Sequence, residues 1–132
     1  MIKEKRESEI TVVACYPGEK AEITTIDHTL DSMKLFVDGF IQAIYPFEDN
    51  VAIVCNEEGK IRCLEPCRAL YDEEGKIYDV IAGAFFICGL GEDDFISLTK
   101  EQQEQYLAMF RNPEMFFLLN DEMVAIPIEE GD

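Results

Sequence analysis

The chain has 132 residues, of which 28 are acidic and 11 are basic, and its formal net charge at pH 7 is −17. A surface this negative repels nucleic-acid phosphates and anionic membranes and attracts cationic partners, so we expect neither direct nucleic-acid binding nor membrane binding. The length fits a single domain. A hydrophobic fraction of 48% supplies a core and argues against intrinsic disorder.

The two ends of the chain differ from its middle. Residues 1–7 are mostly charged and no apolar stretch follows them, so they do not resemble a secretory signal. No Lys or Arg follows Arg111, whereas acidic residues continue to the last position. We therefore expect a flexible N-terminal arm over residues 1–8, a single α+β domain over residues 9–117 and an acidic tail over residues 118–132. The five cysteines lack the paired spacing of a secreted disulfide scaffold, which indicates free thiols in a cytoplasmic protein.

The first third of the chain predicts a hairpin, a helix and further strands. Glu9–Tyr16 is rich in β-branched residues and ends at a Pro-Gly turn, after which Ala21–Ile26 returns as the second strand. Apolar residues at helical spacing follow a polar, capping-type stretch and predict a helix over Leu30–Asp38, with Gly39 as the left-handed residue that ends it. The next predicted strands, Phe40–Phe47 and Val51–Cys55, are separated by a polar turn.

Two later turns share the string EEGKI. They are Asn56-Glu57-Glu58-Gly59-Lys60-Ile61 and Asp72-Glu73-Glu74-Gly75-Lys76-Ile77. A short polar loop that ends in Gly between β-prone residues is typical of a hairpin tip. We predict that Val51–Cys55 pairs with Lys60–Leu64 across the first turn, and that Arg68–Tyr71 pairs with Lys76–Asp79 across the second.

The remaining elements complete the predicted fold. Ala84–Cys88 is continuously apolar, which predicts a central strand buried on both faces. Thr99 and Gln102 match a capping box that opens a helix over Lys100–Phe110. Val124–Ile128 predicts a last strand, although Pro127 indicates that it is either an edge strand or not a strand. The fold class is therefore α+β, with a mostly antiparallel sheet of hairpins and two main helices packed on it.

The sequence offers no recognisable catalytic or metal-binding set. The one histidine, His28, lies at a predicted helix start, where a structural role is the more common one. Cys63 and Cys67 form one loose pair, short of the two pairs of a four-thiolate zinc site. The acidic clusters at Asp72-Glu73-Glu74 and Glu92-Asp93-Asp94 lack the spacing of a calcium loop. We predict no catalytic residue, no metal site and no cofactor.

One cysteine and one arginine are nevertheless singled out. Cys67 follows a proline in a predicted loop and precedes Arg68, whose charge favours a thiolate, so Cys67 is the predicted reactive thiol. The other strand cysteines are expected to be buried and unreactive. Arg68 is expected to form a buried ion pair with an acid, Asp72 or Asp79, with a surface interaction as the alternative.

Several strings carry a resemblance to a known family. They are Ile26-Asp27, Val54-Cys55-Asn56-Glu57-Glu58-Gly59-Lys60, Arg68-Ala69-Leu70, Ile77-Tyr78-Asp79-Val80-Ile81-Ala82-Gly83, Phe85-Phe86-Ile87-Cys88-Gly89 and Asp94-Phe95-Ile96-Ser97-Leu98-Thr99. On these residues the chain resembles DUF3846, an uncharacterised domain carried on phages, plasmids and conjugative elements of Gram-positive and gut bacteria. The resemblance implies a small cytoplasmic protein of a mobile element and no particular activity. Cys67 stands where that family often has Asn, so no role is carried over to it.

Three hypotheses about function follow. The leading one is a non-enzymatic accessory protein of a mobile element that acts by contact with a protein partner. The alternative is an acidic DNA mimic that inhibits a basic DNA-binding or defence protein, and a weaker alternative is a redox or ligand-binding protein that uses Cys67. The residues singled out as interaction candidates are Glu57, Glu58, Glu73, Glu74 and Arg68.

Overall fold

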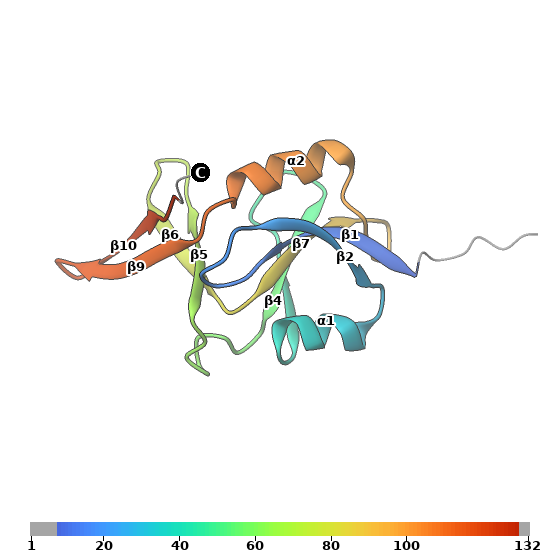
Figure 1. Cartoon of the computed structure of the whole chain (residues 1–132), viewed down its shortest axis with the longest axis horizontal. Coiled ribbons are helices and arrows are strands. Elements are labelled where there is room, and N and C mark those ends of the chain that lie inside the picture. The colour runs from blue at the N-terminus through green and yellow to red at the C-terminus, as the bar shows by residue number, and fades with distance from the viewer. Residues whose placement is uncertain (1–7, 130–132) are drawn as a thin grey trace, which may run out of the picture.

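The computed structural model describes residues 8–129, so the expected N-terminal arm lies outside the described residues except for Ser8. An antiparallel six-stranded sheet in the order β2-β1-β7-β4-β3, with β8 beside β7, forms the centre of the fold (Figure 1). Its strands are β1 (Glu9–Cys15), β2 (Glu22–Asp27), β3 (Ile41–Ile44), β4 (Val51–Asn56), β7 (Phe85–Leu90) and β8 (Phe95–Ile96). Two separate hairpins are β5 (Pro66–Tyr71) with β6 (Ile77–Ala82) and β9 (Glu114–Leu119) with β10 (Glu122–Pro127). With the helices α1 (Leu30–Val37) and α2 (Lys100–Met109), the predicted α+β class is confirmed.

The central strand β7 is buried on both faces because a helix lies on each side of the sheet (Figure 1). Ile87 belongs to the apolar cluster that contains Tyr106 of α2, whereas its neighbour Phe86 belongs to the cluster that contains Met33 of α1. Consecutive side chains of a strand point to opposite faces. An apolar residue at every position of β7 therefore supplies both cores, as the continuous apolar run of the sequence predicts.

Both helices are fixed at their N-termini by threonine. The Thr99 side chain accepts a hydrogen bond from Gln102 N, and the Gln102 side chain accepts one from Thr99 N, which is the predicted capping box. The Thr29 side chain caps α1 by accepting one hydrogen bond, from Ser32 N. The left-handed residue after α1 is Asp38, at φ 64°, rather than the predicted Gly39. Gly39 serves close packing instead, since a Cβ there would lie 2.8 Å from the side-chain amide nitrogen of Asn56.

The two EEGKI strings adopt different structures. The second forms the tip of the β5–β6 hairpin, where the Asp72 carboxylate accepts hydrogen bonds from Glu74 N and Lys76 N and Gly75 has φ 81°. β5 and β6 pair in the predicted region, with Leu70 opposite Asp79.

The first EEGKI string belongs to an irregular turn. Arg62 N donates to Glu58 O at 2.8 Å and Leu64 N donates to Gly59 O at 2.9 Å. The predicted pairing of Val51–Cys55 with Lys60–Leu64 is wrong, because β4 already has β3 on one edge and β7 on the other.

The end of the described chain is a hairpin rather than the expected acidic tail. β9 and β10 pair from Leu119 opposite Glu122 to Glu114 opposite Pro127, and they extend away from the rest of the molecule (Figure 1). Asn120 and Asp121 connect the strands with φ values of 52° and 68°. Positive φ at both loop residues is typical of a type I′ turn, which Asn and Asp tolerate. We call residues 114–127 the C-terminal hairpin.

Candidate functional site

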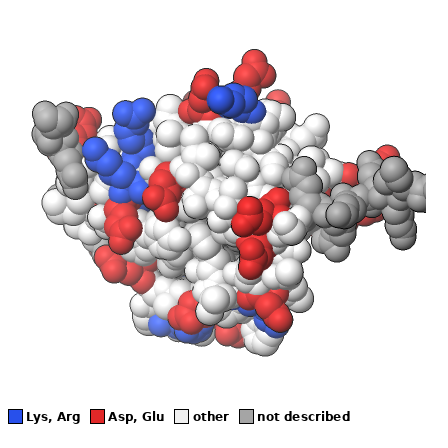
Figure 2. Space-filling view, turned by 45° about the vertical axis from the view of Figure 1, so that its right-hand side comes forward, with Lys and Arg blue, Asp and Glu red and all other residues white. Residues whose placement is uncertain are grey.

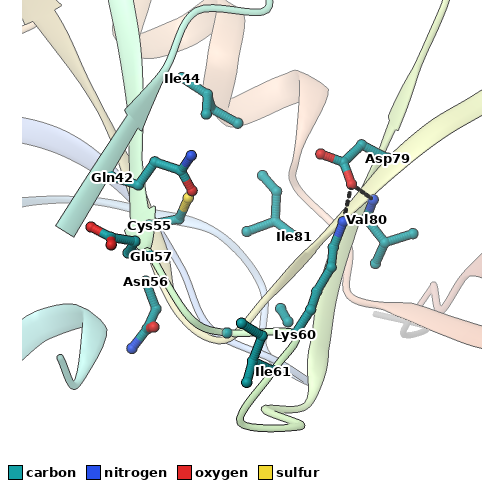
Figure 3. Close-up of a pocket in the computed structure, with 12 residues that line it drawn as sticks. Gln42, Ile44, Cys55, Asn56, Glu57, Lys60, Ile61, Asp79, Val80 and Ile81 are labelled. Atoms are coloured by element: carbon teal, nitrogen blue, oxygen red, sulfur yellow. Dashed lines mark hydrogen bonds and ion pairs between the residues drawn. The ribbon is translucent and has the colours of Figure 1, made fainter. Parts of the chain in front are cut away.

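A cleft of about 260 Å3 lies between the β3–β4 edge of the main sheet and strand β6 (Figure 3). Gln42 of β3, Cys55 of β4 and Glu57 of the following turn line one side. On the other side Lys60 forms an ion pair with Asp79, whose carboxylate also accepts a hydrogen bond from Val80 N at 2.9 Å. The turn that carries the first EEGKI string thus forms one wall of the cleft.

The chemistry of this cleft suits hydrogen bonding rather than nucleophilic attack by its thiol. Burial raises the pKa of Cys55 to about 11, with a further rise from the Asp79 charge and an opposing effect of Lys60. The thiol therefore stays protonated at neutral pH. The Lys60 charge is matched by Asp79, so the polar side chains of the cleft are the amides of Gln42 and Asn56, the neutral Cys55 thiol, the Glu57 carboxylate and one ion pair.

Cys67 is not the reactive thiol that its neighbours predict. Its side chain is almost fully buried in strand β5. Burial raises its pKa to about 12, whereas Arg68 lowers it by less. Arg68 does lower the pKa of the Cys67 thiol, as predicted, but the desolvation of the thiol raises that pKa by more. The exposed thiol is Cys63, and all five cysteines are free.

Arg68 is a buried residue that links several segments of the fold, so its side chain is not accessible to a partner. Its guanidinium is fully buried and donates hydrogen bonds to Phe110 O at 3.0 Å, Cys67 O at 2.9 Å and Glu19 O at 2.7 Å. The predicted ion pair with Asp72 or Asp79 is wrong, because backbone carbonyls are its hydrogen-bond acceptors and Lys60 is paired with Asp79. Arg68 therefore ties β5 to the end of α2 and to the β1–β2 turn.

The four predicted interaction glutamates lie on two different turns. All four are exposed, and Glu57 lines the cleft whereas Glu73 and Glu74 lie at the tip of the β5–β6 hairpin. On the face shown in Figure 2, acidic side chains form separate groups, several of them beside Lys or Arg. Their arrangement there is a scattered one.

The helix-start histidine is held by an acid from a distant loop. His28 Nε2 lies 3.2 Å from Asp94 Oδ2, and the imidazole is largely buried. His28 thereby joins the start of α1 to the loop between β7 and β8, which is a structural role.

Within residues 8–129, no group of three or more His, Cys, Asp or Glu side chains is placed to hold a metal ion. Neither helix of this part of the chain has the length and apolar composition that crossing a membrane requires.

The C-terminal hairpin carries a feature that the sequence analysis missed, namely large apolar side chains in solvent. The exposed fractions are 55% for Met115, 40% for Phe117, 67% for Leu118, 57% for Leu119, 40% for Met123 and 47% for Ile126. The signal was present in the sequence, as two apolar runs that flank Asn120-Asp121. The sequence analysis interpreted residues 118–132 as an acidic tail because of their acidic composition, and it did not consider these apolar runs as a hairpin.

An apolar pocket of about 300 Å3 opens at the base of this hairpin, lined by Glu114 and mostly apolar neighbours. Tyr71, Tyr78 and Met109 belong to its lining and are themselves about half exposed. Tyr71 also lines a second hollow beside strand β10. The pocket therefore adjoins the hairpin, through a hollow whose lining includes Lys76 and Glu122 as well as apolar residues.

Comparison with known proteins places the chain in a family without assigning it an activity. No curated protein and no solved structure matches it. The family model described as a domain of unknown function, DUF3846, matches residues 10–111, from β1 to just after α2, so that the C-terminal hairpin lies beyond the match. Since the matched segment makes up most of the 132 residues, the chain belongs to the DUF3846 family.

Proposed function

We propose that this protein is a non-enzymatic interaction module that binds a protein partner through its C-terminal hairpin. The observation that carries the proposal is the exposure of large apolar side chains on both faces of β9–β10. Monomeric proteins rarely expose contiguous apolar patches larger than a few hundred Å2, and larger patches mark interaction surfaces. An isolated two-stranded hairpin is marginally stable in water, so a partner that covers this one also stabilises it.

The proposed setting is the cytoplasm of a bacterium that carries a mobile element, where the protein has an accessory role. Five free thiols support a reducing compartment. The net charge of −17 supports a partner that is neutral or cationic overall, because an acidic partner would be repelled.

The alternative proposal, an acidic mimic of DNA, makes a different demand on the surface. A mimic needs carboxylates in a row at the spacing of phosphates, on a face that lacks basic side chains. The net charge supports this alternative, whereas the separate acidic groups beside Lys and Arg in Figure 2 favour the apolar docking surface.

The test is affinity capture from bacterial lysate at low and high salt, followed by reconstitution with the purified captured protein. The hairpin variant is Leu118→Thr with Met123→Thr, a cross-strand pair in which Thr preserves β propensity. The control is Leu35→Gln, since Leu35 is an apolar side chain of α1 that is 83% exposed. A third bait carries Gln at Glu57, Glu58, Glu73 and Glu74.

We expect a partner that is retained at high salt, kept by the Leu35 control and the Gln bait, and lost by the hairpin variant. Capture of a basic DNA-binding protein only at low salt, and its loss with the Gln bait, would overturn the proposal in favour of the mimic. Salt decides between them because the Debye length falls from about 10 Å at 0.1 M to about 3 Å at 1 M, which weakens exposed charge pairs.

A further inference from the structure

The pocket at the base of the C-terminal hairpin combines aromatic rings with one carboxylate. Its volume of about 300 Å3 lies at the lower end of the range for small-ligand sites, which is roughly 300–1,000 Å3. The aromatic residues that line it are Phe47, Tyr71, Tyr78 and Phe110. Among the described residues that line it, Glu114 is the only one with an acidic or basic side chain. We call it the Glu114 pocket, and its carboxylate would repel an anionic ligand.

We propose that the Glu114 pocket binds the ammonium group of an organic cation, with the alkyl substituents of the ligand against the rings and its charge beside the carboxylate. A cation is attracted to the face of an aromatic ring, and a site lined by several rings is how proteins recognise alkylated ammonium groups. An ionised carboxylate adds direct charge attraction. The proposal goes beyond the docking function above, because a partner that covers Leu118 and Met123 does not have to enter this pocket.

The inner wall of the pocket is fixed by ring packing. Phe110, at the end of α2, is buried, and its ring centroid lies 5.6 Å from that of Phe85 and 6.3 Å from that of Phe47. Phe47 packs in turn on Tyr106, with ring centroids 5.1 Å apart. Rings held in this way keep their positions without a ligand, so little conformational entropy is lost when a ligand binds.

The mouth of the pocket consists of side chains that a ligand can reach. Tyr71, Tyr78 and Met109 are each about half exposed. The two tyrosines belong to the β5–β6 hairpin and Met109 belongs to the end of α2, so a ligand would enter between these elements. Burial raises the pKa of the Tyr71 hydroxyl and the Glu114 charge raises it further, which shows that the field of the carboxylate extends to the mouth.

The Glu114 carboxylate is held in place, but its charge is incompletely stabilised. Its Oε1 oxygen accepts a hydrogen bond from Ala69 N at 2.8 Å, which is the one hydrogen bond of this side chain within residues 8–129. Burial raises the pKa of Glu114 by more than the Ala69 hydrogen bond and the Arg68 charge together lower it. The pocket therefore stabilises the negative charge less well than water does, and a bound cation would supply the difference.

The buried charge of Arg68 does not occupy this carboxylate. Within the described part of the chain, the hydrogen bonds of the guanidinium end on Cys67, Phe110 and Glu19, and none ends on Glu114. Its effect on the pKa of Glu114 is smaller than that of the single hydrogen bond from Ala69. Arg68 thus reduces the attraction of the carboxylate for a cation and leaves room for a ligand to bind it.

The experiment is an NMR titration of the isotopically labelled full chain with butyltrimethylammonium at mildly alkaline pH, which favours the ionised form of Glu114. Because a net charge of −17 attracts cations to every exposed acid, the titration uses about 0.1 M salt, which limits such attraction to about 10 Å. We expect saturable shifts of the amides of Ala69, Tyr78 and Phe110 and no change at Leu35 of α1. The methyl resonances of the ligand should move upfield, since they lie over aromatic faces.

A neutral probe and matched variants separate the site from general charge attraction. A compound of the same shape in which carbon replaces the charged nitrogen should bind about fivefold more weakly or worse. Glu114→Gln, which keeps an acceptor for Ala69 N, should weaken binding about fivefold or more, whereas Glu73→Gln at the exposed hairpin tip should have no effect. Tyr78→Leu should weaken binding about threefold, and Tyr78→Phe, which keeps the ring, should restore it.

Equal binding of the charged and neutral probes, or equal effects of Glu114→Gln and Glu73→Gln, would overturn the proposal. A capped peptide with one trimethyllysine identifies the source of the cation. Tighter binding of the peptide than of the free probe would support a side chain of a protein partner, and weaker binding would support a small molecule. Absence of saturable binding by both would also overturn the proposal, while capture of a partner through Leu118 and Met123 would stand.

Discussion

The carboxylate of Glu114 accepts a hydrogen bond from the backbone N–H of Ala69 at 2.8 Å. Ala69 lies opposite Val80 in the β5–β6 hairpin, and Val80 N in turn donates to Asp79. Carboxylates thus accept from one backbone N–H on each outer edge of that hairpin, so these two donors are not available to a further strand. The Glu114 contact also anchors the base of the C-terminal hairpin to strand β5.

Replacing Glu114 should show a pH dependence of defined sign. Burial raises the pKa of Glu114 above its usual 4.5, and the Ala69 hydrogen bond and the Arg68 charge offset part of that rise. A raised carboxyl pKa means that the stabilising contribution of this group is present below pH 4.5 and is lost as the pH rises through the folded-state value. Gln keeps an acceptor for Ala69 N without the charge.

We therefore compare the free energy of unfolding of Glu114→Gln with that of the unaltered chain. We expect the difference in favour of the Gln variant to increase as the pH rises from acidic to neutral. Urea denaturation at several pH values measures the difference. An advantage of Gln that shrinks as the pH rises would contradict the assigned pKa direction. Glu114→Ala, which removes the acceptor, should cost about 1–3 kcal/mol because a partly buried N–H is left unpaired.

Removing the Arg68 guanidinium should be among the most damaging single changes. It is fully buried and donates to the carbonyls of Phe110, Glu19 and its neighbour Cys67, so Arg68→Met leaves buried acceptors without donors. We expect a loss of about 3 kcal/mol or more, since hydrogen bonds to charged groups are worth about 1.5–3 kcal/mol each. The measurement is denaturant unfolding monitored by circular dichroism.

Arg62→Met is the matched control for that change. Arg62 reaches Asp38 from the surface with a half-exposed side chain, and exposed pairs contribute about 1 kcal/mol or less. Similar losses for the two variants would mean that the Arg68 contacts do not hold the fold.

Thiol reactivity should follow burial rather than the neighbouring charge. Burial raises the pKa of Cys67 and Cys88 to about 12 and that of Cys55 to about 11, so these groups remain neutral thiols. With a thiol reagent at neutral pH we expect one fast-reacting group, Cys63, which is exposed. Mass spectrometry of Cys63→Ser should show little labelling of the folded chain. Fast labelling of Cys67 would revive the hypothesis of a cysteine-dependent activity.

The two glycines of the EEGKI strings should respond differently to substitution. A Cβ at Gly59 would lie 2.6 Å from the carbonyl oxygen of Ala82, whereas Gly75 has open space and a φ of 81°. We expect Gly59→Ala to cost about 2 kcal/mol or more by forcing the backbone apart. Gly75→Asn should cost less than about 1 kcal/mol because Asn tolerates the left-handed conformation. Equal losses in thermal unfolding would show that the two turns are alike.

These glycines also show where sequence reasoning stops. Local signals predicted the elements that depend on local chemistry, such as the Thr99 capping box and the apolar strand around Phe86. The two EEGKI strings are locally identical, and only the partners of the flanking strands distinguish them. β4 is occupied on both edges by β3 and β7, which no local pattern reveals.

The candidate site was predicted less well than the fold, for a related reason. Cys67 was interpreted as a group near solvent because a proline precedes it, and Arg68 as the buried partner of Asp72 or Asp79. Strand β5 packs against the end of α2, which buries Cys67 and gives Arg68 a backbone carbonyl as acceptor in place of an acid. The exposed Leu118 and Met123 went unnoticed because apolar residues are expected in the core. Burial is a tertiary property, and it decided the role of each of these residues.

The most direct test of the C-terminal hairpin as a docking surface is photo-crosslinking in living bacteria. A photoreactive amino acid is placed at Leu118, and in separate strains at Leu35 and Glu73. All three positions are exposed, but they lie on the C-terminal hairpin, on α1 and at the β5–β6 tip. We expect a discrete crosslinked protein from position 118 and none from the other two. Crosslinks from position 73 with none from position 118 would contradict the assignment of the C-terminal hairpin as the docking surface. They would favour the acidic turns as the interaction site.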